Sequence, residues 1–373
     1  MIANTFRASL LSQKRIQFFL GIAKISTAPL NEVIIRDIGD KGVIILNRPK
    51  QLNILSKPMI ANIYFTLKEW KKRKQLVLIK GADEKAFCAG GDLNMAYTGD
   101  SNLDVIEYFK FQYSTDALIN SYNIPYISIV DGIVMGSGVG LSIHGRYRVA
   151  TERTLFAMPE TKIGYFPDAG TSHFLPRLSG RLGWFLGLTG YRLKGTDTVK
   201  TGIATHYCKS ENLKDLEDSL LNCSNESEIK TALDKYHMEN CTEFSLTPYL
   251  EKINYCFSAE TIEGILSRLE EDGSQWAKNT LNTLRKMSPT SLKITMKLLD
   301  LGKKLTLPEC LQIEYRLAYN LVNYGTDVYI GTKALVEKNR NPKWNPPTLS
   351  DVSENFVDKY FAKIPQELDL SDL

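Results

Sequence analysis

The sequence predicts an α/β domain followed by a helical C-terminal region, and three observations support this fold class. Apolar strand-like stretches alternate with helical stretches up to about residue 208. This alternation is typical of parallel strands joined by right-handed crossovers. From about residue 212 onward the strand-like stretches give way to successive amphipathic helices. We therefore divide the chain into a leader at 1–31, an α/β core at 32–210 and a helical region at 211–373.

The leader differs in composition from the rest of the chain. It contains no Asp or Glu, and Arg7, Lys14, Arg15 and Lys24 alternate with apolar and hydroxyl side chains. A helix of this composition would be basic and amphipathic, as mitochondrial transit peptides are. The alternatives are a secretory signal, which the Lys14-Arg15 pair opposes because it interrupts the apolar run, and a disordered basic tail.

The elements of the predicted core follow in order along the chain. Residues 32–48 are apolar on either side of Gly39-Asp40-Lys41-Gly42, which predicts a hairpin. Pro58 begins a helical pattern that continues to Trp70. Apolar residues at spacings of three and four predict a second helix over 102–122. Further apolar stretches predict strands at 75–81, 126–132, 146–151 and 154–158.

The helical region shows amphipathic stretches in close succession, and a proline-rich loop and a last helix follow over 341–361. These amphipathic stretches are 215–222, 228–236, 261–271, 274–287, 291–302 and 307–324. We expect them to pack on the α/β core and on neighbouring subunits, because each has one apolar face to bury.

The composition excludes several classes of protein. The formal net charge of the 373-residue chain is only +4, so charge alone gives no case for a nucleic-acid or membrane partner. No run of 18 apolar residues occurs, so we expect no transmembrane helix. The six cysteines and four histidines show no metal-ligand spacing. We therefore expect reduced thiols and no metal site.

Two glycine-rich segments follow predicted strands. Gly90-Gly91 lies in "CAGGD", and Gly136-Ser137-Gly138 leads into a helix. Neither matches a P-loop, and "GSGVG" departs from the dinucleotide-binding pattern by one position. Exposed glycine backbone can also present N–H groups, and one from each segment could bind a single carbonyl oxygen as it becomes an anion. The alternative is two tight turns that need glycine at positive φ.

Two acids follow in the stretch "FAMPETKIGYFPDAGTSHFL". Glu160 comes after Met-Pro and Asp168 after Phe-Pro, and each is surrounded by apolar residues. Burial among apolar groups raises the proton affinity of a carboxyl group, so both acids are candidates for general acid–base catalysis. The alternative is that they cap helices, and for Asp168 the following "DAGTSHFL" favours a helix start.

Together these stretches resemble the crotonase, or enoyl-CoA hydratase/isomerase, superfamily, and in particular its 3-hydroxyisobutyryl-CoA hydrolase branch. The core resemblance lies in "AFCAGGDL", in the stretch from "DGIVMGSGVG" to "YFPDAG", and in "LPRLSG". The motifs "MSPTSLKIT", "EYRLAYN" and "NPKWNPPTLSDV" extend it through the helical region and are typical of the hydrolase branch. The resemblance covers roughly residues 32–360 and implies a crotonase-like spiral of ββα units with a C-terminal helical region.

The resemblance also implies roles for individual residues. The thioester oxygen of an acyl-CoA would lie between the backbone N–H groups of Gly91 and Ser137. Glu160 would be the main catalytic carboxylate, either as a nucleophile that forms an anhydride or as a base for water. Asp168 would bind the substrate 3-hydroxyl and assist proton transfer. Hydratases of the superfamily carry a second glutamate where this chain has Gly140, so the sequence favours thioester cleavage over hydration.

The chain departs from the hydrolase pattern at three places. A substrate-contacting position that is usually Glu is Gln112, which can hydrogen-bond but carries no charge. The middle glycine of the second loop is Ser137, which places a side chain beside the expected oxyanion site. The glycines after the Pro-Asp pair are replaced in "DAGTSHF".

Three functions remain in view. The first is a thioester hydrolase of the mitochondrial matrix that acts on 3-hydroxyisobutyryl-CoA in valine breakdown. It needs no cofactor, since CoA is part of the substrate, and it could be a homo-oligomer. The second is a structural subunit of the mitochondrial ribosome small subunit, with ribosomal proteins and rRNA as partners and with activity weakened or lost. The third is isomerisation. The retained acids Glu160 and Asp168 favour the hydrolase.

Overall fold

The computed structural model describes residues 32–92, 102–239, 242–339 and 341–373. The predicted transit peptide at 1–31 lies outside these residues. Two sheets form the core of the described chain. The first has the order β1-β2-β3-β5-β7-β10, with the bounds Val33–Ile38, Lys41–Leu46, Leu76–Gly81, Tyr126–Val130, Tyr147–Ala150 and His206–Tyr207. The second has the order β4-β6-β8-β9, with the bounds Ala86–Cys88, Ile133–Met135, Leu155–Ala157 and Leu193–Lys194.

The chain runs through the two sheets as a spiral. β1 and β2 form the predicted antiparallel hairpin, and β2, β3, β5, β7 and β10 are parallel. β3, β5 and β7 each lead directly into a short parallel strand of the second sheet, β4, β6 and β8. A helical segment follows each pair: α4 (Asn102–Asn120), α5 (Ser137–Ile143) and the 3-10 turn η2 (Glu160–Ile163). These are the ββα units that the resemblance implies.

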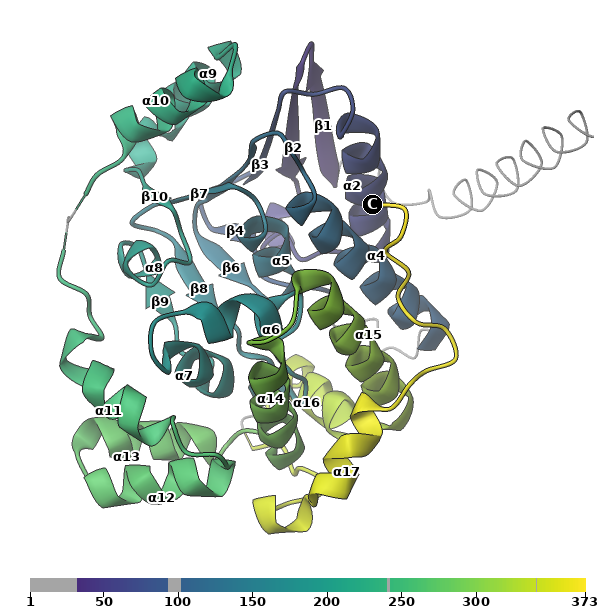
Figure 1. The fold of residues 1–373 in the computed structure, drawn as a ribbon, viewed down its shortest axis with the longest axis vertical. Helices are drawn as coiled ribbons and strands as arrows, with labels where there is room; N and C mark the ends of the chain where they lie inside the picture. Colours follow the sequence, from purple (N-terminus) through teal and green to yellow (C-terminus); the bar gives the residue numbers. More distant parts are fainter. Residues whose placement is uncertain (1–31, 93–101, 240–241, 340) are drawn as a thin grey trace, which may run out of the picture.

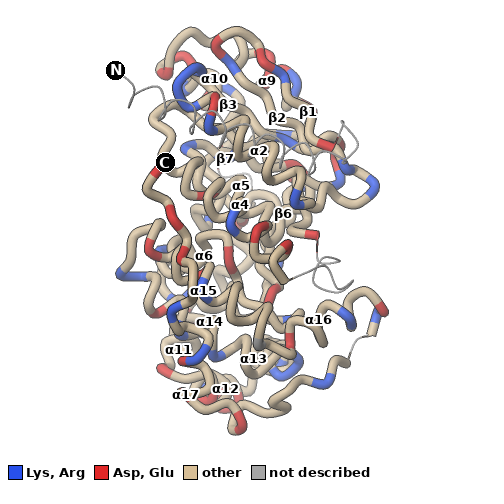
Figure 2. The backbone as a smooth tube through the Cα atoms, turned by 90° about the vertical axis from the view of Figure 1, so that its right-hand side faces the viewer, with Lys and Arg blue, Asp and Glu red and all other residues tan. Residues whose placement is uncertain are grey.

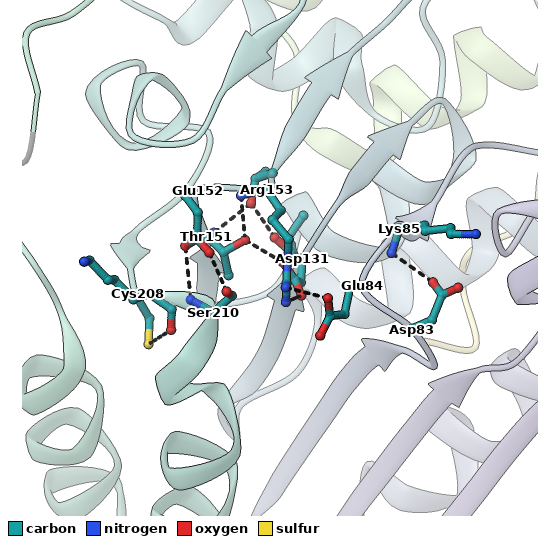
Figure 3. Close-up of polar contacts among 12 residues, drawn as sticks. Asp83, Glu84, Lys85, Asp131, Thr151, Glu152, Arg153, Cys208 and Ser210 are labelled. Carbon is teal, nitrogen blue, oxygen red and sulfur yellow. Dashed lines mark hydrogen bonds and ion pairs between the residues drawn. The ribbon is translucent and has the colours of Figure 1, made fainter.

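One polar cluster links the three short connections between the paired strands, β3 to β4, β5 to β6 and β7 to β8 (Figure 3). Asp131, between β5 and β6, accepts hydrogen bonds from Thr151 Oγ1 at 2.6 Å and from Arg153 Nε at 2.9 Å, both between β7 and β8. Arg153 also forms an ion pair of 2.8 Å with Glu84, between β3 and β4. Because charge-assisted bonds are the stronger ones, this cluster helps to fix the three connections relative to one another.

Helices cover both faces of the first sheet. Apolar side chains of α9 (Leu213–Asn222) and α10 (Glu226–Tyr236) pack on one face, against residues of β2, β3, β5 and β7. α2 (Lys57–Trp70) packs on the other face, and α4 lies beside it (Figure 1). Ser56 caps α2 by accepting the amide of Met59, and a proline stands in the first turn, as predicted.

The helices predicted for the C-terminal region are all present, with small shifts of their ends. Beyond α9 and α10, the helices of this region are α11 (Leu250–Cys256), α12 (Ile262–Asp272), α13 (Gln275–Leu284), α14 (Pro289–Gly302), α15 (Leu307–Tyr324), α16 (Asp327–Val336) and α17 (Glu354–Asp358). The short helices α6 (Thr171–Phe174), α7 (Leu182–Thr189) and α8 (Asp197–Lys200) precede them. Sequence analysis missed α7, α8, α11 and α16. Every residue of α7 is buried, so it lacks the polar face that reveals a helix in a sequence.

Packing continues from the core into the helical region. One apolar cluster joins Tyr113 and Phe166 of the core to Leu311 and Tyr315 of α15. α15 also lies against α4. Among the described helices none has the length and apolar character needed to cross a membrane. The described cysteines are all free thiols, and Cys241 lies outside the described residues.

Candidate active site

The candidate site lies where three neighbouring parallel strands end. Gly90-Gly91 follows β4, Gly136-Ser137 follows β6 and Pro159-Glu160 follows β8. Since β4, β6 and β8 are adjacent and parallel, their carboxyl ends share one edge of the second sheet. The two predicted oxyanion segments and the predicted catalytic acid therefore meet at this edge, although they are far apart in the sequence.

The two segments that carry the predicted amide donors lie close together. A Cβ atom built on Gly91 would lie 3.2 Å from Ser137 Oγ. Leu55 pairs with the backbone on either side of Gly91, donating to the Gly90 carbonyl and accepting from the Asp92 amide, both at 2.9 Å. In the turns and loops of the described part of the chain, neither the Gly91 N–H nor the Ser137 N–H donates a hydrogen bond to a backbone carbonyl. Both amides are therefore candidates for binding a substrate oxygen.

Glu160 stands beside these amides. A Cβ atom on Gly136 would lie 3.1 Å from Glu160 Oε1, and Gly136 itself has a φ of +49° that favours glycine. Only 6 % of Glu160 is exposed, and its Oε2 is buried without a hydrogen-bond partner among the described residues. Burial raises the pKa of Glu160 well above its ordinary value, and the charge of Asp168 raises it further.

Asp168 is held by a tyrosine from α4. Tyr113 Oη donates to Asp168 Oδ2 at 2.8 Å. The helix that follows is capped by Gly170 with no side-chain capping bond, so Asp168 is not its N-cap. Burial raises the pKa of Asp168 to about 7, although the Tyr113 hydrogen bond acts in the opposite direction. The carboxyl group of Asp168 therefore gains and loses its proton close to neutral pH.

Gln112 lies one helical turn from a third buried acid, Asp116, which the sequence does not predict as a site residue. Gln112 Nε2 donates to Asp116 Oδ1 at 2.9 Å and lies 3.4 Å from the Ser137 carbonyl oxygen. A Cβ atom on Gly140 would lie only 2.6 Å from Asp116 Oδ1. The structure thus brings the Asp116 carboxyl group from α4 to the position where the sequence shows no acid. Gly140 by itself is therefore a weaker argument against hydration than the sequence suggested.

The loop after Asp168 is held by Glu314 of α15, which sequence analysis also missed. Glu314 accepts hydrogen bonds from the amides of Gly170 at 2.7 Å and Ser172 at 3.1 Å, and from Ser172 Oγ at 2.5 Å. Ala169 and Gly170 both have positive φ, at 58° and 78°. A fully buried acid from the helical region therefore fixes a strained turn next to Asp168.

This arrangement suits attack on a carbonyl group. Two free amides can stabilise an oxyanion, and an acid beside them can act as nucleophile or base. The described residues contain no group of His, Cys, Asp and Glu side chains that could hold a metal ion.

Comparison with known proteins agrees with this geometry. The model of the enoyl-CoA hydratase/isomerase family matches residues 41–361. The mitochondrial 3-hydroxyisobutyryl-CoA hydrolase of Danio rerio is 47 % identical over 347 residues, covering 90 % of this chain and 91 % of the relative. That of Homo sapiens is 45 % identical over 349 residues, covering 91 % and 90 %.

The chain belongs to the 3-hydroxyisobutyryl-CoA hydrolase branch of the enoyl-CoA hydratase/isomerase family. The predicted family and fold class are thus confirmed. A crystal structure of a carnitinyl-CoA dehydratase from Mycobacterium thermoresistibile superposes with a TM-score of 0.86 at 32 % identity, covering 91 % of this chain and 99 % of that one. An enoyl-CoA hydratase from Rhodobacter sphaeroides superposes with a TM-score of 0.82 at 30 % identity, covering 91 % and 100 %. The fold therefore extends over the helical region as well as the core.

Proposed function

We propose that the chain hydrolyses 3-hydroxyisobutyryl-CoA to 3-hydroxyisobutyrate and CoA, as a step of valine breakdown. Its membership in the hydrolase branch supports the reaction, and the position of Glu160 beside the Gly91 and Ser137 segments carries the chemical argument. The acyl-CoA is the substrate, and we expect no separate cofactor, since the proposed oxyanion hole and the acid would together supply the chemistry.

In this proposal the thioester oxygen binds the two free amides and Glu160 attacks the carbonyl carbon. The C–S bond breaks and CoA leaves as the thiolate. Water then hydrolyses the anhydride to 3-hydroxyisobutyrate and the Glu160 carboxylate, and of the two protons released one goes to the CoA thiolate and one to solvent. Alternatively, Glu160 takes a proton from water, which attacks the carbonyl carbon directly. Asp168 binds the 3-hydroxyl group and exchanges a proton. The carboxylate is the reactive form of Glu160. Because burial raises the pKa of Glu160, this form becomes abundant only at a higher pH than in an exposed glutamate.

Release of CoA from 3-hydroxyisobutyryl-CoA tests the proposal. We expect the wild type to release CoA, and Glu160→Ala to abolish release while retaining the fold. In a single turnover in water labelled with oxygen-18, label in the Glu160 peptide would establish nucleophilic attack, with water opening the anhydride at the Glu160 carbonyl carbon. The exposed Glu251→Gln is a matched control. Well-folded wild-type protein that releases no CoA would contradict the proposal.

A structural role in the ribosome is not favoured. The relatives reported above are hydrolases, and the site keeps both acids. Basic and acidic residues are interspersed along the outer helices in Figure 2, so the face shown carries both signs of charge. Binding to rRNA relies mainly on basic side chains that neutralise phosphates.

We further propose that the chain acts in the mitochondrial matrix. The curated relatives bear mitochondrial names, and the composition of 1–31 is that of a transit peptide. Import of the full chain, compared with a chain that lacks 1–31, tests this location.

A further inference from the structure

Ser137 carries a hydroxyl group at one of the two amide positions, and Tyr108 of α4 contacts it. Tyr108 Oη donates to Ser137 Oγ at 2.9 Å, and the bond is buried. Burial raises the pKa of Tyr108 well above its ordinary value, so the phenol keeps its proton and remains a donor at physiological pH. The Ser137 hydroxyl therefore accepts the hydrogen bond from Tyr108. Its own proton can be donated to a different acceptor.

Both hydroxyl groups lie beside the other amide. A Cβ atom on Gly91 would lie 2.7 Å from Tyr108 Oη and 3.2 Å from Ser137 Oγ. Among the described residues, no hydrogen bond is donated by Ser137 Oγ to a protein acceptor. Ser137 is 5 % exposed, which is close to the exposure of Glu160, at 6 %. The unused proton of Ser137 thus belongs to a buried hydroxyl group that lies next to Gly91, the other predicted amide donor.

We propose that the Ser137 hydroxyl is a third hydrogen-bond donor to the thioester oxygen, held in place by Tyr108. This inference rests on the proposed thioester chemistry at the same site. A hydroxyl group that accepts a hydrogen bond becomes a stronger donor, because bonds in a chain polarise one another. Ser137 would be a catalytic residue that touches the substrate, and Tyr108 a positioning residue that acts through it.

Single and double variants test this relay by steady-state kinetics. We expect Ser137→Ala, which removes only the hydroxyl group, to lower kcat by roughly tenfold to a hundredfold with little change in KM. Tyr108→Phe should lower kcat by a smaller factor. In the Ser137→Ala background it should have no further effect, because the group it orients is gone. Ser121→Ala and Tyr64→Phe remove the same atoms away from the site and should leave kcat unchanged.

The carbonyl stretching frequency of bound substrate gives a readout that is independent of turnover. In a Glu160→Ala background, which keeps the thioester intact, the Ser137 hydroxyl should lower this frequency. Ser137→Ala in that background should shift it back toward the value in water-free solvent. The frequency reports the hydrogen bond even if the wild type released no CoA, so failure of the proposed function and failure of this inference are distinguishable.

Two results would overturn the inference. One is an unchanged carbonyl frequency in Ser137→Ala. The other is a Ser137→Ala or Ser137→Gly variant that keeps or exceeds the wild-type kcat, which would mean that the hydroxyl group only occupies space in the site. Thermal unfolding of each variant separates a kinetic effect from loss of the fold.

Discussion

Burial of Asp168 affects both the stability of the fold and the pH at which this carboxyl group ionises. Burial raises its pKa to about 7 in the folded chain, well above the ordinary value of 3.8. Because the folded state holds the proton more tightly than the unfolded state, stability falls as the pH rises between these values. The full difference corresponds to roughly 4 kcal/mol. The same shift gives the site a carboxyl group that can exchange a proton near neutral pH.

Burial raises the pKa of Asp168, and the hydrogen bond from Tyr113 lowers it in part, so removing this hydroxyl group should move the pH profile. In Tyr113→Phe the hydrogen bond that lowers the pKa of Asp168 is lost, and the pKa should rise above about 7. If the ionised acid is the active form, the rising limb of kcat/KM should shift to higher pH. The loss of activity should then be larger at pH 6 than at pH 9.

A kcat/KM profile between pH 5 and 9.5 measures this shift, with Tyr64→Phe as the control on α2. A Tyr113→Phe profile whose midpoint coincides with that of the wild type would contradict the assigned role of the hydrogen bond.

At this scale the sequence predicts some site residues and misses others for a physical reason. Glu160 and Asp168 are recognisable because each follows a proline in an apolar stretch. Asp116 and Glu314 lie within helices, where an acid is ordinary on a solvated face. Their burial results from the packing of α4 and α15 on the core, and no local pattern encodes that packing.

At the scale of elements, one helix, α4, provides several of the side chains that contact the site. Tyr108 contacts Ser137, Gln112 lies near the Ser137 carbonyl, Tyr113 holds Asp168 and Asp116 lies against Gly140. The sequence predicts this helix from apolar residues at spacings of three and four, but its buried residues also include the polar Gln112 and Asp116. The sequence does not predict β4 and β6, although it predicts β8, which is equally short, within 154–158.

The turn after Asp168 depends on a second element, α15, through Glu314. In Glu314→Gln one carboxylate oxygen becomes an NH2 group that faces an amide donor, either Gly170 N–H or Ser172 N–H. A buried donor without an acceptor costs about 1–3 kcal/mol. We therefore expect a lower free energy of unfolding and a higher KM, because Asp168 loses its fixed position.

Denaturant unfolding and steady-state kinetics measure these two effects, with the exposed Glu251→Gln as the matched control. A Glu314→Gln variant with wild-type stability and KM would show that the three hydrogen bonds do not hold the turn.

At the scale of the whole molecule, the predicted division at residue 210 does not coincide with a break in packing. Tyr113 and Phe166 share one apolar cluster with Leu311 and Tyr315, and all four are nearly or fully buried. The hydrophobic periodicity of a sequence reveals which face of each helix is apolar, but it does not reveal which partner that face will cover. The helical region is thus easy to predict as helical, whereas its role in building the site is visible only in the structure.

Deleting the chain after Met287 tests whether the helical region is part of the catalytic unit. The shortened chain keeps Gly91, Ser137, Glu160 and Asp168 but loses Glu314 and the apolar side chains of α14 and α15 that cover the core. Fully burying one large apolar side chain stabilises a fold by about 1.5–3 kcal/mol, so loss of several exceeds the stability of a typical domain. We expect a shortened chain that is aggregated or molten and releases no CoA, measured by size-exclusion chromatography, dye binding and the CoA assay. A chain that lacks only 1–31 keeps every site residue and should retain activity. A soluble, monodisperse shortened chain with the wild-type kcat would instead mean that the α/β core forms the site without the helices that pack on it.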